Sequence, residues 1–358
     1  MASVSSRTVG NLALASVFAV TVGCASTSPE KPFKSARALV EERSGHRIAW
    51  AEAGDDEGAV RRRIHTLARR ELDADAAVEI ALLGNPGLRA TYEDLAIAQA
   101  DLVQAGLLKN PSFDAGVAFP IAGDVTTGVS LGVTEDFLSI FTIAARKKIA
   151  ARALEASTLR VADSVLELAH RVQVAFYELQ AAEQLLTMDR VIVDAEAGAR
   201  AIARAQHDAG NVDDLTLATE EAAYEELETD RLRAETHVTK AREALVRLLG
   251  LWGADANVRV AAKLPELPPN EPPLGGLEAL ALSHRLDLQA AHAQADGIDH
   301  AVSLAKSTRF LGEPSVGAAY ERAPERYSTL GPTASLEVPL FDQKQAVVAR
   351  LEANLRAA

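Results

Sequence analysis

The feature that most limits the possible folds is one long stretch, 140–208, that contains no proline. Only Gly198 interrupts it, so the whole stretch is predicted to form one helix, roughly 100 Å long at ~1.5 Å per residue. Apolar side chains recur along it in alternating steps of four and three, which is typical of a coiled-coil seam. They are Val161, Val165, Leu168, Val172, Ala175, Leu179, Ala182 and Leu186.

This helix is predicted to be one arm of a long antiparallel hairpin over 140–249. The segment AGNVDD (209–214) breaks the helical pattern, and a second helix is expected from about Leu215 to Leu249. A linker is expected at 261–274, where five prolines follow in close succession. They are Pro265, Pro268, Pro269, Pro272 and Pro273.

Four short segments have a period of two instead, which predicts β-strands at 112–120, 127–135, 314–321 and 332–340. In TGVSLGVT (127–134), apolar residues alternate with Gly and Ser. One apolar face opposite a face of small and polar residues is typical of a transmembrane barrel wall, with lipid outside and water inside. The predicted lipid-facing residues are Phe113, Val117, Phe119, Val129, Leu131, Val133, Val316, Tyr320, Leu336 and Val338.

The strands and the helices around them occur in two copies about 200 residues apart. NPGLRA (85–90) corresponds to RLDLQA (285–290), and NPSF (110–113) corresponds to EPSV (313–316). DFLSIF (136–141) corresponds to EVPLFD (337–342). We therefore predict a first repeat over 72–260 and a second repeat over 275–358.

Four strands are too few to close a barrel. An open edge in lipid leaves backbone N–H and C=O groups unpaired, at several kcal/mol each. The sheet is therefore expected to be completed by other chains, and three chains would give 12 strands around an aqueous lumen.

The N-terminus reads as an export signal over residues 1–23, with Arg7 followed by an apolar run that is too short to span a membrane. Cys24, the only cysteine, ends this run. The segment resembles a bacterial lipoprotein signal, which implies that Cys24 carries a covalent lipid such as palmitate and that Ala25 directs the product to the outer membrane. Residues 24–71 are then expected to be a lipid-anchored extended segment.

These residues together resemble a TolC-type outer-membrane efflux protein, from about Leu72 to the last residue. The stretch beginning LDADAAVEIALLGNPGLRA is similar to the opening helix of that family, AGNVDDLTLATEEAAYEEL to its periplasmic tip and ALVRLLGL to a later helix end. The resemblance implies a mainly α fold with a small β part, assembled as a homotrimer with a 12-stranded barrel and an α-helical tunnel. It also implies a passive exit duct for small molecules or ions, without a cofactor.

The resemblance implies partners as well: a periplasmic adaptor (membrane fusion) protein, an inner-membrane transporter and outer-membrane lipid. Gly210, Asn211, Val212 and Leu215, in the turn between the two long helices, are the predicted docking residues for the adaptor. In the second copy Leu286 replaces the usual proline, and most of the length that would form a second hairpin is missing. We therefore expect either a fragment or a neighbouring chain that supplies the rest.

Other classes of function find little support. The net charge of −13 argues against nucleic acid, which requires clustered Lys and Arg. No catalytic motif is present, so no enzyme is predicted. His284, His292 and His300 recur every eight residues, which separates them by roughly 12 Å on a helix and is too far for one metal ion. The acidic run 213–228 is typical of a solvated helix face.

Two alternatives share the export signal and the helical hairpin. A periplasmic lipid-anchored coiled-coil adaptor would also need a lipoyl-like β domain rich in Gly and Val. A structural envelope lipoprotein would need no barrel strands. Membrane extraction distinguishes them: a barrel protein is expected to resist carbonate washing and to run as a heat-sensitive oligomer, whereas an adaptor or tether without lipid is expected to wash off.

Overall fold

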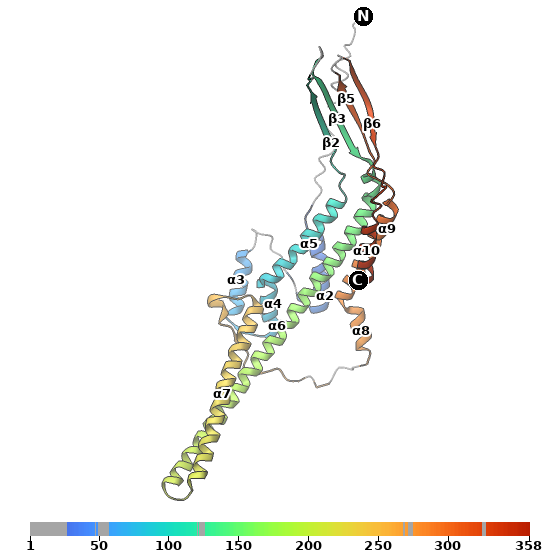
Figure 1. Ribbon diagram of the computed structural model, residues 1–358. Coiled ribbons are helices and arrows are strands. Elements are labelled where there is room, and N and C mark those ends of the chain that lie inside the picture. Colours follow the sequence, from blue (N-terminus) through green and yellow to red (C-terminus); the bar gives the residue numbers. More distant parts are fainter. Residues whose placement is uncertain are drawn as a thin grey trace.

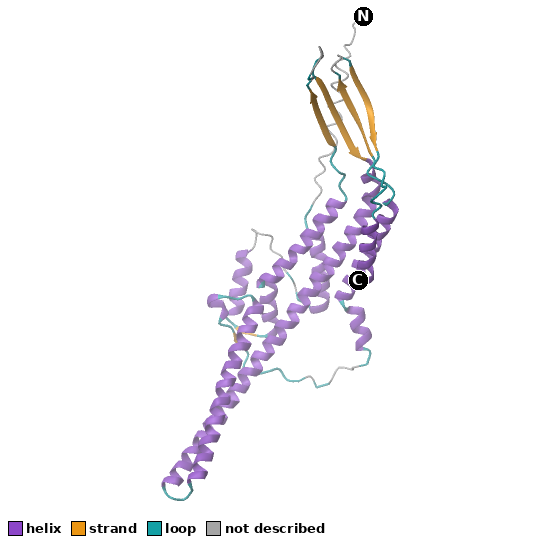
Figure 2. Ribbon diagram, viewed as in Figure 1, coloured by secondary structure: helices purple, strands orange, loops and turns teal. Residues whose placement is uncertain are grey.

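The computed structural model describes residues 27–46, 48, 57–119, 121, 126–267, 269–270, 275–323 and 327–358. These residues form an elongated molecule, with a four-stranded sheet at one end and the turn of a long helical hairpin at the other (Figure 1). Helices make up most of it, and nearly all of the strand residues lie in that sheet (Figure 2). The mainly α class is confirmed. The predicted signal peptide, Cys24 and residues 268 and 271–274 of the linker lie outside the described residues.

The hairpin consists of α6 (Phe137–Asp208) and α7 (Asp214–Leu249). The 72 residues of α6 span about 108 Å. All eight predicted seam residues are buried, because the helices that pack on α6 cover this stripe. Each helix begins at an aspartate whose side chain accepts a backbone N–H three residues ahead: Asp136 from Ser139, and Asp213 from Thr216.

Shorter helices thicken the molecule between the sheet and the hairpin. They are α2 (Glu30–Ser44), α4 (Ala74–Gly84), α5 (Pro86–Ala105) and α9 (Leu286–Thr308), and all four pack on α6. The helix α3 (Glu57–Ala68) packs on α4. The extended conformation predicted for 24–71 is therefore wrong over α2 and α3. In α2 the side chains of Pro32, Ala36 and Val40 are four residues apart, so one helical face buries all three.

The Asn-Pro motif at 85–86 forms a corner that holds α4, α5 and α7 together. The Asn85 side chain caps α5 by accepting the N–H of Leu88 at 3.1 Å, and its amide donates to the carbonyl of Leu248 at 2.8 Å. Gly250 ends α7 with a φ of 68°. A Cβ there would lie 2.8 Å from the carbonyl oxygen of Gly84, so the close contact requires glycine.

Two long-range contacts tie the end of the hairpin back to the rest of the chain. The strand β1 (Glu71–Leu72) pairs in parallel with β4 (Arg259–Val260), which follows the short helix η1 (Gly253–Ala256). The buried Gln180 of α6 donates to the carbonyls of Ala261 and Lys263 at 2.7 and 2.5 Å. The chain therefore leaves the hairpin in a fixed direction along α6.

The second repeat begins with α8 (Leu277–His284) and α9, and ends with α10 (Gln345–Ala357). The helix α10 packs on α9, where Lys306 forms an ion pair with Glu352 at 2.6 Å. Among the helices of the described residues, none combines the length and apolar character needed to cross a bilayer.

The four-stranded sheet contains β2 (Ser112–Ala118), β3 (Gly128–Asp136), β5 (Ser315–Arg322) and β6 (Ser328–Ser335). Its order is β2-β3-β5-β6, and every neighbouring pair is antiparallel. The two copies of the repeat thus meet at β3 and β5 in one sheet. The central strands are paired on both sides, whereas within the described residues β2 and β6 are each paired on one side only.

Candidate functional site: a two-faced sheet and a hairpin tip

The register of the sheet puts its apolar side chains on one face. Residues directly opposite each other in antiparallel strands share a face. Leu131 and Val133 of β3 therefore lie beside apolar neighbours on both sides, and Val129 lies between Val117 of β2 and Arg322 of β5. The apolar neighbours in β2 are Val117, Ala115 and Phe113, and those in β5 are Tyr320 and Ala318. On the other side of β5, Tyr320 lies opposite Leu330 of β6 and Ala318 lies opposite Pro332.

This apolar face is uncovered in the described chain. Phe113 is 71% exposed, Leu131 51% and Leu330 77%. The charged residues of the face stand near its two ends: Glu135 lies one residue from the helical end of β3, and Arg322 ends β5 at the other end of the sheet. An exposed apolar band with charges only near its ends is compatible with a lipid-facing sheet, because charged side chains are tolerated near the membrane interfaces and not at the midplane.

The opposite face carries small and polar side chains. Across β2, β3, β5 and β6 it contains Ser112, Asp114, Gly116, Ser130, Gly132, Thr134, Gly317, Ala319, Glu321, Thr329, Gly331 and Thr333. The strands approach closely on this face: a Cβ on Gly317 would lie 2.1 Å from the carbonyl oxygen of Val133, and one on Gly116 would lie 2.6 Å from Oγ of Ser130. This explains why the residues opposite the apolar ones are so small.

The structure places the predicted lipid-facing residues in two groups. Phe113, Val117, Val129, Leu131, Val133, Val316 and Tyr320 all lie on the apolar face. Phe119 follows the last residue of β2, and Leu336 and Val338 follow the last residue of β6.

The predicted bounds of the fourth strand, 332–340, are thus wrong: β6 begins at Ser328 and ends at Ser335. The last residue pair of β5 and β6 is Ser315 with Ser335. Pro314, the residue before β5, lacks the N–H that would continue the ladder. Leu330 of the apolar face was therefore missed, although it belongs to the same alternation as Ala334 and Leu336 and could have been found by extending it backwards. Pro332 lay within the predicted strand but was not assigned to the lipid-facing set.

At the base of the sheet, polar contacts fix the strand-to-helix connection. Nζ of Lys109 lies 2.6 Å from Oδ2 of Asp136, the residue that ends β3 and caps α6. The guanidinium of Arg146 donates to the carbonyls of Leu107 and Ser139, each at 3.3 Å. These contacts join the loop after α5 to the start of α6, so the sheet and the long helix keep one direction.

Along the hairpin, ion pairs join α6 to α7 at heptad spacing. Glu183 pairs with Arg242 at 2.5 Å, Arg190 pairs with Glu235 at 3.2 Å, and two heptads further along α6 Arg204 pairs with Glu221. The members on each helix are separated by one heptad or by two, so all three pairs report the same register.

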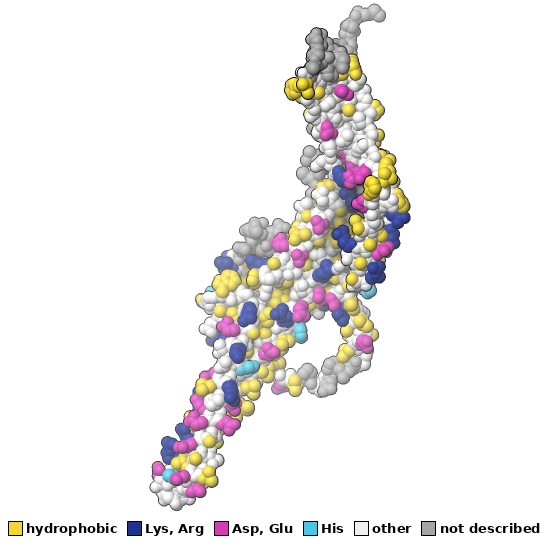
Figure 3. All heavy atoms as spheres, viewed as in Figure 1, with side chains coloured by type: hydrophobic (Ala, Val, Ile, Leu, Met, Phe, Trp, Pro, Cys, Tyr) yellow, Lys and Arg dark blue, Asp and Glu magenta, His cyan; other side chains and the backbone are white. Residues whose placement is uncertain are grey.

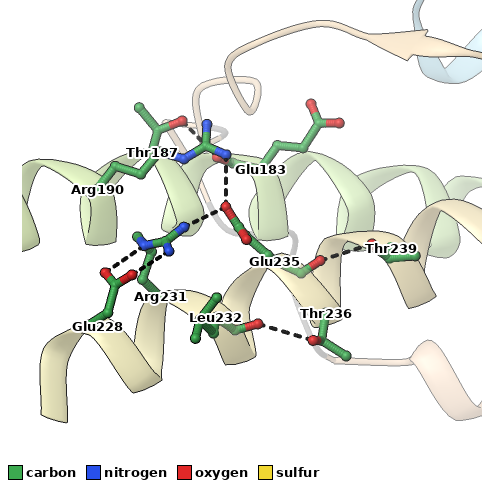
Figure 4. Close-up of polar contacts among 9 residues, drawn as sticks. All are labelled: Glu183, Thr187, Arg190, Glu228, Arg231, Leu232, Glu235, Thr236 and Thr239. Atoms are coloured by element: carbon green, nitrogen blue, oxygen red, sulfur yellow. Dashed lines mark hydrogen bonds and ion pairs between the residues drawn. The ribbon is translucent and has the colours of Figure 1, made fainter. Parts of the chain in front are cut away.

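At the heptad position between the second and third of these ion pairs, the acidic residue of α7 pairs within its own helix. The register places Glu228 of α7 opposite Ala197 of α6, which has no charge. Arg231 instead holds both carboxylate oxygens of Glu228 at 2.6 and 2.8 Å and bonds Glu235 at 2.6 Å (Figure 4). The charged side chains on this part of the hairpin therefore pair with one another, in agreement with a solvated helix face.

The tip of the hairpin is a compact turn. Gly210 has a φ of 78°, and the N–H of Asn211 donates to the carbonyl of Gln206 at 2.8 Å, which completes a Schellman motif at the end of α6. Among the predicted docking residues, Gly210, Asn211 and Leu215 are exposed and Val212 is partly exposed. His207 of α6 contacts Oδ1 of Asp214 at 2.7 Å, which closes the turn from the side.

The hydrogen bond to Asp214 raises the pKa of His207 above its ordinary value of 6.5. The pKa of Asp213 is lowered, chiefly because the hydroxyl of Thr216 donates to its carboxylate. Within the described residues, no cluster of three or more His, Cys, Asp or Glu side chains is placed to hold a metal ion.

Residues 77–251 match the family described as outer membrane efflux protein. No curated protein sequence matches the chain.

Solved structures share the fold. CusC, described by its transmembrane channel formation, is 16% identical with a TM-score of 0.64, covering 80% of this chain and 70% of that one. The outer-membrane channel OprN is 17% identical with a TM-score of 0.63, covering 86% and 73%. The outer membrane protein VceC from Vibrio cholerae is 17% identical with a TM-score of 0.62, covering 79% and 73%.

The family match spans the helices α4 and α5, the first strand pair and the hairpin, which are the elements that build the two-faced sheet and the tip. Proteins of this family are channels and not enzymes. Over residues 77–251 the chain thus matches the outer membrane efflux protein family, which confirms the resemblance noted in the sequence.

Proposed function

We propose that the chain is one subunit of an exit duct in the outer membrane, through which small molecules or ions pass passively from the periplasm to the exterior. One observation supports this most directly: a sheet with an uncovered apolar face, an opposite face of small and polar groups, and two edges that have no partner strand among the described residues. In lipid such edges must be paired. Three copies, each pairing its β6 with β2 of the next, would close a barrel of 12 strands.

In this assembly the small, polar face lines the lumen. Gly, Ser and Thr leave room for water and cargo there, whereas the apolar face contacts acyl chains. The helices extend from the end of the sheet at which α6 begins (Figure 1). In the assembly they would form a tunnel in the periplasm. The exposed tip around Gly210 is then available to a periplasmic adaptor, which would connect the duct to an inner-membrane transporter.

A lipid on Cys24 belongs to the same proposal. It would anchor the chain to the membrane that holds the sheet. The mature chain would then begin near the outer membrane and continue into α2, which lies against α5 and α6.

Spin labels on neighbouring residues of β3 test the proposal in intact cell envelopes. A label at Leu131 is expected to be shielded from a water-soluble relaxation agent and open to oxygen, whereas one at Ser130 is expected to be open to the water-soluble agent. Bulk water at both positions would overturn the barrel.

Extraction distinguishes the barrel from the adaptor and the envelope lipoprotein. The Cys24→Ser variant, which cannot carry a lipid at this position, is expected to resist carbonate washing and to run as a heat-sensitive oligomer. Release of this variant by carbonate, while the unmodified chain is retained, would favour a lipid-anchored protein without a barrel.

A further inference from the structure

A group of exposed apolar side chains lies at the junction between the sheet and the helices, and we call this group the junction girdle. Figure 3 shows part of it as hydrophobic side chains gathered where the sheet ends, with Lys and Arg side chains just beyond. Its aromatic members include Phe141, 67% exposed, and Phe341, 93% exposed. The girdle comprises Phe137, Ile140, Phe141, Phe310, Leu311, Leu336, Val338, Leu340 and Phe341.

The helical side of the girdle is basic, although the chain as a whole is acidic. The first five turns of α6, over 137–154, contain four Lys or Arg side chains and no Asp or Glu. The rest of α6 and the whole of α7 each carry more acidic than basic residues. Along the hairpin, clustered positive charge is therefore confined to the part of α6 that leaves the sheet.

Three of the cations at the junction form no ion pair within the described residues. They are Lys147, Lys148 and Arg309, all exposed. The guanidinium of Arg309 lies 4.2 Å from the ring centroid of Phe310, so an aromatic ring of the girdle holds it in place. Arg152, one turn further along α6, is by contrast paired with Glu155 at 2.7 Å.

The spacing on α6 links the apolar and basic parts. Phe137, Phe141 and Lys148 lie at positions i, i+4 and i+11, and therefore on one helical stripe. Lys148 is about 10 Å beyond Phe141 along the axis. A lysine side chain can cover several ångströms of this distance by extending along the helix toward the aromatic residues. This order, aromatic ring and then cation, is the order of groups at the edge of a bilayer.

We propose that the junction girdle binds anionic phospholipid of the periplasmic leaflet, with Phe141 and its apolar neighbours against the acyl chains and Lys147, Lys148 and Arg309 holding the phosphate-bearing headgroups. The inference rests on the proposed function, because it requires the sheet to lie in the membrane. Charge complementarity selects the occupant: unpaired cations next to exposed aromatic rings fit an anionic amphiphile. The lipid would fix the depth at which the sheet stops and the tunnel begins.

The test uses the delipidated full chain in detergent, titrated with phosphatidylglycerol or phosphatidylcholine, with bound lipids counted by native mass spectrometry. One cation near a membrane surface contributes about a fivefold preference for an anionic lipid. We expect the unmodified chain to bind phosphatidylglycerol at least about fivefold more tightly than phosphatidylcholine. This preference is expected to weaken as salt screens the charges.

The variant Lys147→Gln, Lys148→Gln, Arg309→Gln is expected to lose the preference. A matched control, Lys240→Gln, Arg247→Gln, Lys263→Gln, removes three exposed cations away from the girdle and is expected to keep it. Equal binding of both lipids by the unmodified chain, or an unchanged preference in the girdle variant, would overturn the inference.

A spin label at Leu131 separates this inference from the proposed function. If the label is shielded from water while the lipid preference is absent, the sheet is in the membrane and only the headgroup site is wrong. If the label reports bulk water in intact envelopes, both proposals fail.

Discussion

At the scale of single residues, two glycines with similar backbone angles have different reasons to be glycine. Gly210 and Gly250 both have positive φ, at 78° and 68°. A Cβ at Gly210 would meet nothing within 4 Å, whereas one at Gly250 would press on the backbone of Gly84 and Asn85. Substitution of Gly210 therefore tests backbone strain alone, whereas substitution of Gly250 tests backbone strain together with a steric clash.

We predict that Gly210→Ala lowers the free energy of unfolding by about 1 kcal/mol, the cost of the left-handed conformation alone. Gly250→Ala is predicted to cost clearly more, because the corner at Asn85 must also move. Thermal unfolding of the two variants measures the difference. Equal costs would show that the corner is not rigid.

His207 gives the tip a dependence on pH. Its contact with Asp214 raises its pKa in the folded state, so protonation stabilises the folded turn. The contribution is complete below the ordinary value of 6.5 and is lost as pH rises through the raised pKa.

An NMR titration of histidine-labelled chain is predicted to give His207 a pKa above 6.5, and Asp214→Asn is predicted to bring it back toward that value. The His237→Gln variant serves as the control for assignment, because it removes another exposed histidine of the hairpin and should leave the signal of His207 in place. A pKa of His207 that Asp214→Asn leaves unchanged would contradict the contact.

At the scale of elements, the ladder of ion pairs sets the register of α6 against α7. Single exposed ion pairs stabilise proteins by only about 0–1 kcal/mol. Together, however, they favour one register of α6 against α7, because a slip by one residue would separate all three pairs at once.

We predict that Glu183→Arg destabilises the hairpin, because it places two arginines face to face, and that adding Arg242→Glu restores most of the loss. The coupling measured by a double-mutant cycle should be about 0.5–1 kcal/mol and should fall at high salt. The same cycle at Arg204 and Glu221, which are more exposed, should give a smaller value. A coupling of zero at Glu183 and Arg242 would remove them from the ladder.

At the scale of the whole molecule, the two faces of the sheet are expected to respond differently to the same charge. An arginine on the lipid face near the middle of the bilayer costs about 2–4 kcal/mol, whereas an arginine in a water-filled lumen is solvated. Leu131 and Ser130 are neighbours in β3 and lie on opposite faces.

We predict that Leu131→Arg strongly reduces the amount of heat-sensitive oligomer recovered from membranes, whereas Ser130→Arg leaves most of it. Gel mobility with and without heating gives the measurement. Similar losses for both variants would mean that the two faces have similar surroundings, contrary to a barrel wall.

Features that depend on local periodicity could be predicted correctly from the sequence. The seam from Val161 to Leu186, the turn at 209–214 and the alternation in β3 are of this kind. The position of β6 was predicted wrongly, because alternation continues through Leu336 and Val338 and does not show where the partner strand ends. The helices α2 and α3 in 24–71 were not predicted, because helices as short as these are stabilised mainly by packing on other elements.

The sequence by itself determined the long hairpin, the two-faced strands and the duplication, since helix and strand periods are written in consecutive residues. Only the tertiary structure decided which strands are neighbours, where each one stops, and which charges pair across α6 and α7. It also brought the start of α6, with Arg146, beside Arg309 and Asp342, which lie far away in the chain. Contacts of this kind arise from packing between distant segments, and no local pattern records them.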